Sequence, residues 1–231
     1  MIIRTLLCLF TIMSIALADI PKTPDDSTTK PASVSALSIA DLSGFDAFPS
    51  EVKSLLSEAL ALTQKKLTYT FGSSDPSRGG MDCSGTIYRL LQDHKVPDAP
   101  RQSDELCLWV KAESTLHLTP TAGALDHAEF AALQPGDLLF WTGTYATSER
   151  KLPISHVMLY LGKRKTDGKP VIFGASDGRR YEGQSRCGVS VFDFELPKPG
   201  GKVAFYGYGP VPGLIKEEIR KPAPIEPKAK P

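Results

Sequence analysis

The sequence has almost no net charge. Its 27 Lys and Arg residues are balanced by 26 Asp and Glu residues, which leaves a formal charge of +1. A protein that binds nucleic acid or a strongly acidic surface usually carries an excess of basic residues, so the composition gives no reason to expect either partner. Hydrophobic residues make up 41% of the chain and charged residues 23%, a balance typical of a globular domain with a core.

Long apolar runs are missing after the first twenty residues, so we expect no membrane span. The chain begins MIIRTLLCLFTIMSIALADI. Arg4 precedes an apolar stretch, and the triplet that ends at Ala18 gives the small-x-small pattern of a cleavage site. This order predicts a signal peptide over residues 1–18, and therefore an exported protein, in the periplasm or outside the cell. A membrane anchor is the alternative, but the run is shorter than the roughly 20 residues that a spanning helix needs.

Metal-ligand patterns are absent as well. The chain has four histidines, and none of them has metal-ligand spacing with a cysteine. We therefore expect no metal and no cofactor.

Composition divides the chain into two tails and one folded unit. Residues 19–45 are rich in Pro, Ser, Thr and Asp without periodicity, which predicts a disordered linker. Residues 216–231 alternate Lys, Glu and Pro, which predicts a disordered tail. No internal repeat is present, so we expect residues 46–215 to form one domain. We also expect the protein to be a monomer.

Within that unit, helices come first and strands follow. Helical spacing of apolar residues predicts a helix in PSEVKSLLSEALALTQKK, a second helix that begins near Cys83, and a shorter one over Ser103–Glu113. After Gly136 the segments DLLFW, HVMLYLG, PVIFGAS, GVSVFDF and VAFYGY are short, rich in β-branched and aromatic residues, and separated by turn residues. This order predicts an α+β fold with an antiparallel sheet.

The stretch GGMDCSG places Cys83 after two glycines, at the start of the second predicted helix. Unpaired backbone N–H groups at a helix start favour a thiolate and can bind a developing oxyanion. A thiol in this position needs a base. His156, at the start of a predicted strand in ISHVMLYLG, is the best candidate. The alternative is that Cys83 is a buried small hydrophobe and His156 a structural residue.

Three stretches taken in order resemble the NlpC-type (NlpC/P60) cell-wall cysteine peptidases: LTYTFGSSDPSRGGMDCSGTIYRLL, LQPGDLLFW and ISHVMLYLG. The resemblance covers residues 67–194. It implies a papain-like α+β fold, with N-terminal helices packed on a five- to six-stranded, mostly antiparallel sheet. It also implies hydrolysis of peptidoglycan stem peptides, commonly at the bond between D-γ-glutamyl and the following diamino acid.

Carried over by position, the resemblance implies that Cys83 is the nucleophile and His156 the base. Tyr69, in YTFG, matches a tyrosine that lines the site in the family, and Asp82 and Ser84 match residues that flank the nucleophile and help to hold the substrate. Two other functions stay open. One is a related Cys–His amidase that cuts between sugar and peptide, and the other is a catalytically impaired module that binds cell-wall peptides.

One position departs from the family pattern. The family usually has a third polar residue, often His, in a stretch such as HAS on the next strand, and here that stretch is FGAS with Gly174 in its place. A glycine has no side chain to hold an imidazole. Counting across the predicted hairpin places Ser176 and Asp177 opposite His156, so we predict that Asp177 orients the ring. The alternative is an Asx turn before Gly178.

Two further predictions concern less specific signals. The stretch DGRRYEGQSR predicts a solvated basic loop, and contact with a carboxylate of a stem peptide is its alternative. With Cys83 set aside as reactive, export permits a disulfide between Cys107 and Cys187. A buried free thiol is the alternative at Cys107, because this residue falls inside a predicted helix.

Overall fold

The computed structural model describes residues 30–96, 98–113, 115–147 and 150–215. The predicted signal peptide and the predicted C-terminal tail lie outside these residues. In the part of the chain that the structure describes, we find no helix with the length and apolar character that crossing a membrane requires.

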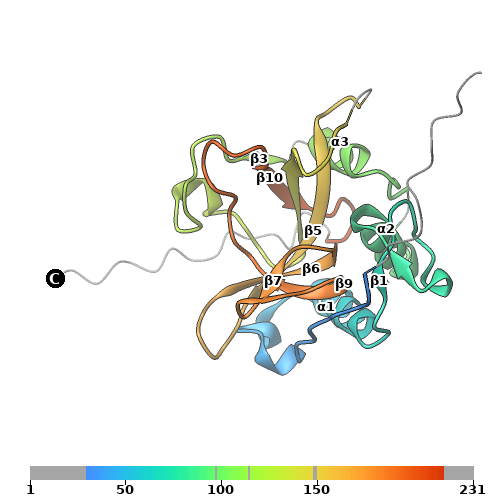
Figure 1. Cartoon of the computed structure of the whole chain (residues 1–231). Coiled ribbons are helices and arrows are strands. Elements are labelled where there is room, and N and C mark those ends of the chain that lie inside the picture. Colours follow the sequence, from blue (N-terminus) through green and yellow to red (C-terminus); the bar gives the residue numbers. More distant parts are fainter. Residues whose placement is uncertain (1–29, 97, 114, 148–149, 216–231) are drawn as a thin grey trace, which may run out of the picture.

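Three α-helices precede the main sheet (Figure 1): α1 (Ser50–Thr63), α2 (Cys83–Asp93) and α3 (Ser103–Ala112). They lie where the sequence predicts them, and each buries the face on which apolar side chains recur at helical spacing. Short 3-10 helices shape the connections, namely η2 (Ile39–Asp41), η3 (Phe45–Ala47), η4 (Pro76–Arg78) and η5 (Ala128–Phe130).

The main sheet has six antiparallel strands in the order β3-β10-β4-β5-β6-β9. Its strands are β3 (His117–Leu118), β4 (Asp137–Thr142), β5 (Ile154–Lys163), β6 (Pro170–Ser176), β9 (Gly188–Asp193) and β10 (Ala204–Pro210). Two small sheets accompany it, the parallel pair β1 (Thr68–Tyr69) and β2 (Gly80–Met81) and the antiparallel pair β7 (Arg180–Tyr181) and β8 (Gln184–Ser185). Five strands of the main sheet were predicted, β3 was not, and the predicted α+β class is confirmed.

The main sheet buries a different apolar layer on each face, because side chains alternate along a strand. Val157 and Leu159 of β5 belong to the layer that includes the helices, and α2 and α3 both pack on this strand. Trp141 and Met158 belong to the opposite layer, which is rich in aromatic residues and includes Phe130 of η5. The two layers fix the direction in which each side chain of β5 points.

Residues 30–45 are not the disordered linker that their composition predicts. Ser33 and Cys187 exchange two backbone hydrogen bonds of 2.9 and 3.0 Å, and the backbone N–H of Ser35 donates to Ser190 Oγ at 2.7 Å. Leu42 is completely buried. Scattered apolar residues without periodicity give no local signal, yet tertiary contacts, with the β9 region at Ser33 and Ser35 and with Arg164 at Leu42, hold the segment in the fold. Residues 30–45 therefore belong to the folded unit, and this segment is drawn in blue beside α1 in Figure 1.

The predicted disulfide between Cys107 and Cys187 is wrong, because all three described cysteines are free thiols. Cys107 is fully buried on α3 within the helix-side core. Cys187 lies just before β9, and its sulfur is 3.9 Å from the hydroxyl of Thr68. The alternative of a buried free thiol at Cys107 therefore holds.

Candidate active site

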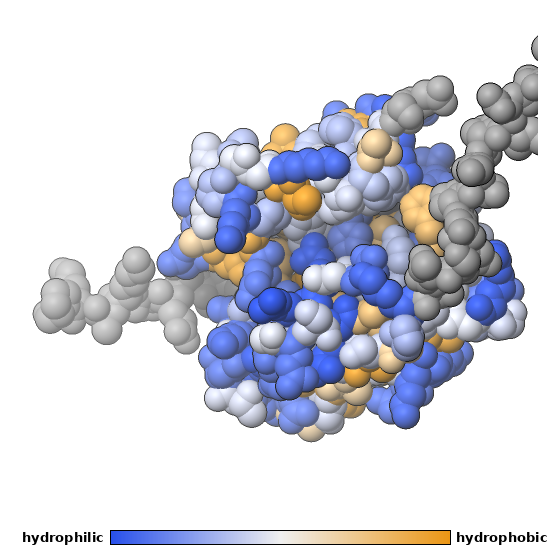
Figure 2. Space-filling model, viewed as in Figure 1, coloured by the Kyte–Doolittle hydropathy of each residue, from blue (hydrophilic) through white to orange (hydrophobic). Residues whose placement is uncertain are grey.

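A cleft of about 860 Å³ lies at the end of the sheet where β5 begins and β6 ends. Figure 2 shows that the face carrying the β7 hairpin is hollowed near its centre. The cleft brings together side chains from distant parts of the chain, among them Tyr69, Phe71, Tyr145, His156, Ser176, Asp177, Arg179 and Glu195.

Cys83 is the first residue of α2, as the sequence predicts. Its thiol lies beside β5, close enough to the backbone N–H of Val157 for that group to favour the thiolate. Val157 directly follows His156, so the fold brings the two predicted catalytic residues into one region although 73 positions separate them in the chain (156 − 83 = 73). Only 4% of Cys83 is exposed. The thiol therefore lies behind the wall of the cleft rather than open to solvent.

The helix start does not make Cys83 a ready thiolate. Burial, together with the negative charge of Asp82, raises the pKa of the thiol to about 11, although nearby backbone N–H groups and Arg101 act in the opposite direction. Removing the negative charge of the thiolate from water destabilises it by more free energy than the N-terminal end of one helix stabilises it. At neutral pH the thiol of the resting protein is protonated, which corrects the expectation from position alone.

His156 lies on β5, where it pairs with Trp141 of β4, and the two rings meet edge to face with centroids 5.7 Å apart. Its Nε2 is buried and has no hydrogen-bond partner among the described residues. Burial lowers the pKa of the imidazole well below its usual value, and the positive charge of Arg179 lowers it further. His156 is therefore neutral at physiological pH, with a nitrogen available to take a proton.

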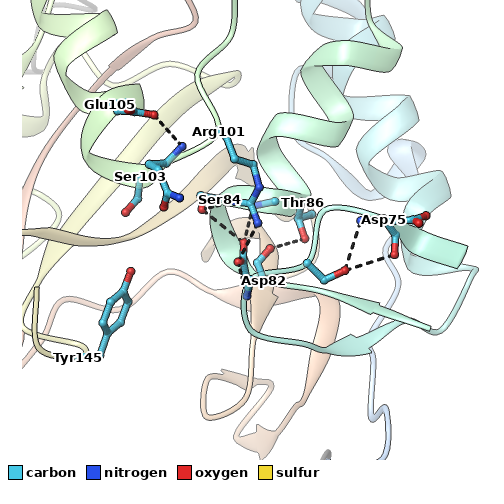
Figure 3. Close-up of polar contacts among 12 residues, drawn as sticks. Asp75, Asp82, Ser84, Thr86, Arg101, Ser103, Glu105 and Tyr145 are labelled. Carbon is cyan, nitrogen blue, oxygen red and sulfur yellow. Dashed lines mark hydrogen bonds and ion pairs between the residues drawn. The ribbon is translucent and has the colours of Figure 1, made fainter. Parts of the chain in front are cut away.

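Asp82 and Ser84 occupy structural positions rather than lining the cleft. Asp82 caps α2, accepting from the backbone N–H of Gly85, and it also accepts from Gly72 at 2.8 Å. Arg101 reaches both residues, at 2.9 Å from Asp82 Oδ2 and 2.8 Å from Ser84 Oγ (Figure 3). Because these partners use the polar atoms of both side chains, the predicted substrate contacts are not supported by the geometry.

Tyr69 lies in the cleft wall, near the residues that the resemblance assigns to catalysis. Burial raises the pKa of its hydroxyl, and the negative charge of an ionised Cys83 would act in the same direction. Phe71 and Tyr145 extend this wall with an edge-to-face contact at 5.7 Å between ring centroids. Arg150 fixes Tyr145 by donating to its hydroxyl at 2.7 Å. An aromatic wall of this kind presents an apolar surface to a bound peptide.

Asp177 does not orient His156 in this structure. Its carboxylate lies 3.7 Å from Lys30 Nζ, its side chain is 60% exposed, and no hydrogen bond joins it to the imidazole. The strand register gives the reason. Leu159 pairs with Phe173, and the same register continued along β5 and β6 would place Ser176, not Asp177, opposite His156. A shift of one residue turns the side chain to the other face of the sheet.

Arg179 is the site residue that sequence reasoning did not single out. Its guanidinium carbon lies 4.2 Å from the centroid of the Trp141 ring, and the side chain lines the cleft with His156. The stretch DGRRYEGQSR gave two opposite signals, since turn residues favour a solvated loop and adjacent arginines favour anion binding. The structure separates them, because Arg180 is exposed whereas Arg179 is half-buried.

The α+β fold brings a helix-start cysteine and a strand histidine into one region, which is the arrangement of a Cys–His site. The sequence model of the NlpC/P60 family matches residues 66–172, which include both residues, and confirms the resemblance to this family.

Other comparisons add little to this assignment. A solved structure of a Staphylococcus aureus protein, described as similar to lipoprotein, NLP/P60 family, is 20% identical with a TM-score of 0.42. The alignment covers 71% of this chain and 42% of that one, so this chain spans less than half the length of that protein. No curated protein matches the sequence.

Proposed function

We propose that this protein is an exported cysteine peptidase that hydrolyses peptidoglycan stem peptides at the bond between D-γ-glutamyl and the following diamino acid. One observation carries the proposal. Cys83 begins α2 and lies near the backbone of Val157, next to His156, within the segment that the family matches. The cleft of about 860 Å³ has the volume of a site for a short peptide.

In the proposed reaction the neutral imidazole of His156 takes the proton of the Cys83 thiol as the sulfur attacks the scissile carbonyl carbon. Backbone N–H groups at the start of α2 stabilise the oxyanion that forms. His156 then returns the proton to the leaving amine as the C–N bond breaks. Water, activated by the same imidazole, attacks the thioester, and release of the acid restores the thiol.

A binding module is the second candidate, because three features oppose turnover in the resting protein. The thiol of Cys83 has a raised pKa, His156 has no hydrogen-bonded holder among the described residues, and Gly174 stands where the family pattern has a polar residue. A protein that binds the same peptides without cleaving them would have the same cleft as the peptidase and would lack only catalytic activity.

Incubation of the protein with purified muropeptides, followed by mass spectrometry of the products, tests the proposal. We expect cleavage at the γ-glutamyl bond and its loss in Cys83→Ala. Cys187→Ala is the matched control, since it removes another buried thiol outside the cleft and should keep activity. Binding without cleavage by the unsubstituted protein would favour the module, and a cut between sugar and peptide would favour the amidase.

Export is part of the proposal and rests on residues 1–18. Intact-mass measurement on the protein recovered from the producing cell's exterior or periplasm should give a chain that begins at Asp19. A chain that retains Met1, or a lipid on Cys8, contradicts it.

A further inference from the structure

Arg179 has no anionic partner among the described residues, unlike three other arginines that are at least partly buried. Arg101 pairs with Asp82 at 2.9 Å and Arg150 with Asp104 at 3.4 Å, while Arg164 contacts three carboxylates. Among the described residues, none forms an ion pair or a hydrogen bond with the guanidinium of Arg179. A half-buried cation without a partner is costly, so the arrangement indicates a ligand that supplies the missing charge.

The guanidinium is also held in place before any ligand binds. Its planar group stacks on Trp141 at 4.2 Å, and Trp141 is completely buried between β10 and β5. Stacking restricts the rotation of the long side chain and leaves the N–H groups at the edge of the plane free to donate. Two N–H groups on one edge of a guanidinium point in parallel, like the prongs of a fork. This geometry matches a carboxylate, which can accept two parallel hydrogen bonds.

The position of Arg179 places that ligand beside the catalytic pair. Arg179 lines the cleft together with His156, and the negative charge of a Cys83 thiolate would stabilise its positive charge. Burial lowers the pKa of the guanidinium to about 10, so it still carries a proton at neutral pH. Glu195 also lines the cleft and its negative charge acts on Arg179, but no ion pair joins the two side chains.

The residues expected to hold the substrate do not compete for this role. Asp82 and Ser84 are engaged with each other and with Arg101, and a carboxylate such as Asp82 would repel an anion. Tyr69 and Phe71 offer mainly ring surface. Arg180 is the other arginine that lines the cleft, and it is exposed. A substrate anion that enters the cleft therefore finds its best-oriented donor in Arg179.

We propose that Arg179 is a specificity residue that binds a free carboxylate of the substrate and selects stem peptides with an ionised γ-glutamyl α-carboxyl group over those in which this group is an amide. The proposal rests on the proposed function and adds a substrate preference to it. An amide at this position would present N–H groups to the N–H groups of the guanidinium and could accept only through its carbonyl oxygen.

Binding to the Cys83→Ala protein tests the preference without turnover. The probes are the tripeptide L-Ala-γ-D-Glu-L-Lys and the same tripeptide with the glutamyl α-carboxyl group as an amide. Tryptophan fluorescence is a suitable readout, because the chain has two tryptophans and one of them, Trp141, lies under Arg179. Isothermal titration provides a second measure of both dissociation constants.

We expect the acid to bind about 10- to 100-fold more tightly than the amide, as charge-assisted hydrogen bonds allow. Arg179→Gln should bring the ratio close to one, and Arg179→Lys, which keeps the charge but not the fork, should retain part of it. Arg180→Gln is the matched control and should keep the ratio. A purely structural role for Arg179 would change both affinities together and leave their ratio intact.

The outcomes separate this inference from the proposed function. Equal cleavage and equal binding of the two tripeptides by the unsubstituted protein would overturn the inference and leave the peptidase standing. A preference that depends on Arg179 without cleavage would support the inference and overturn the peptidase. Equal losses in Arg179→Gln and Arg180→Gln would overturn the assignment to Arg179, because diffuse positive charge would then explain the preference. Absence of both binding and cleavage would overturn both proposals.

Discussion

The sulfur of Met158 fills the space beside Gly174. A Cβ added at position 174 would stand 2.6 Å from Met158 Sδ and 3.3 Å from its methyl carbon. Met158 and His156 lie two positions apart on β5, so their side chains share one face of the sheet. The missing polar residue and the buried methionine are therefore two parts of one local arrangement. The space in which the family pattern would put an imidazole holds an apolar side chain.

This relationship predicts that Gly174→His alone will fail to improve catalysis. The new side chain collides with Met158 and should lower stability, because overpacking a buried layer typically costs about 1–3 kcal/mol. Gly174→His combined with Met158→Ala should instead raise kcat about tenfold or more, by holding the imidazole of His156 in one orientation. Steady-state kinetics on a γ-glutamyl tripeptide checks this. Met158→Ala alone is the control, and equal rates in it and in the double variant would contradict the prediction.

The raised pKa of Cys83 predicts an alkaline rate profile. Because burial holds the thiol pKa near 11, the thiolate fraction should increase across the whole range from pH 7 to pH 10. We expect kcat/KM and the rate of alkylation by iodoacetamide to keep rising through pH 9. Asp82→Asn removes a negative charge that raises this pKa, so it should move the alkylation curve to lower pH. A plateau below pH 8 in the unsubstituted protein would show that the thiol ionises more easily than its surroundings indicate.

Asp82 should matter for stability more than for substrate affinity. It caps α2, binds the loop at Gly72 and pairs with Arg101 while only 7% exposed. Asp82→Ala should lower the free energy of unfolding by about 1–3 kcal/mol, since a cap and a paired buried group are lost together. Asp75→Ala is a matched control, because Asp75 caps the exposed helix η4. Urea denaturation that gives the same loss in both variants would argue against the role of Asp82.

The sequence predicted the regular elements well because their signals are local. The α2 start at Cys83 and the β6 span 170–176 agree with the structure, since capping, helical spacing and β-branched runs depend on neighbouring residues. The site was harder to predict because it depends on register and burial. One residue of register separates Ser176 from Asp177, and only the packed fold shows that the thiol of Cys83 is desolvated.

The inward direction of Arg179 could not be predicted from the sequence. A pair of arginines in a turn-rich stretch predicts a solvated loop, and nothing local indicates which of the two turns inward. The direction follows from Trp141, which is 38 positions earlier in the chain (179 − 141 = 38) and offers its ring face to the guanidinium. Long-range stacking of this kind has no pattern within the stretch itself.

The last prediction concerns acid stability and depends on His156. Burial lowers the pKa of this imidazole well below its usual value of 6.5. Below pH 6.5 the unfolded chain therefore binds a proton that the folded chain does not, and the free energy of unfolding should fall as the pH falls, by up to about 1.4 kcal/mol per pH unit. The stability from the neutral imidazole is present above pH 6.5 and is lost toward the folded pKa.

Urea denaturation at pH 7.5, 6.0 and 5.0 should show this slope, and His156→Gln should reduce it even if that variant is less stable at every pH. His127→Gln is the control, since the side chain of His127 is 42% exposed, and it should keep the slope. An unchanged slope in His156→Gln would show that other groups, rather than this imidazole, take up the protons on unfolding.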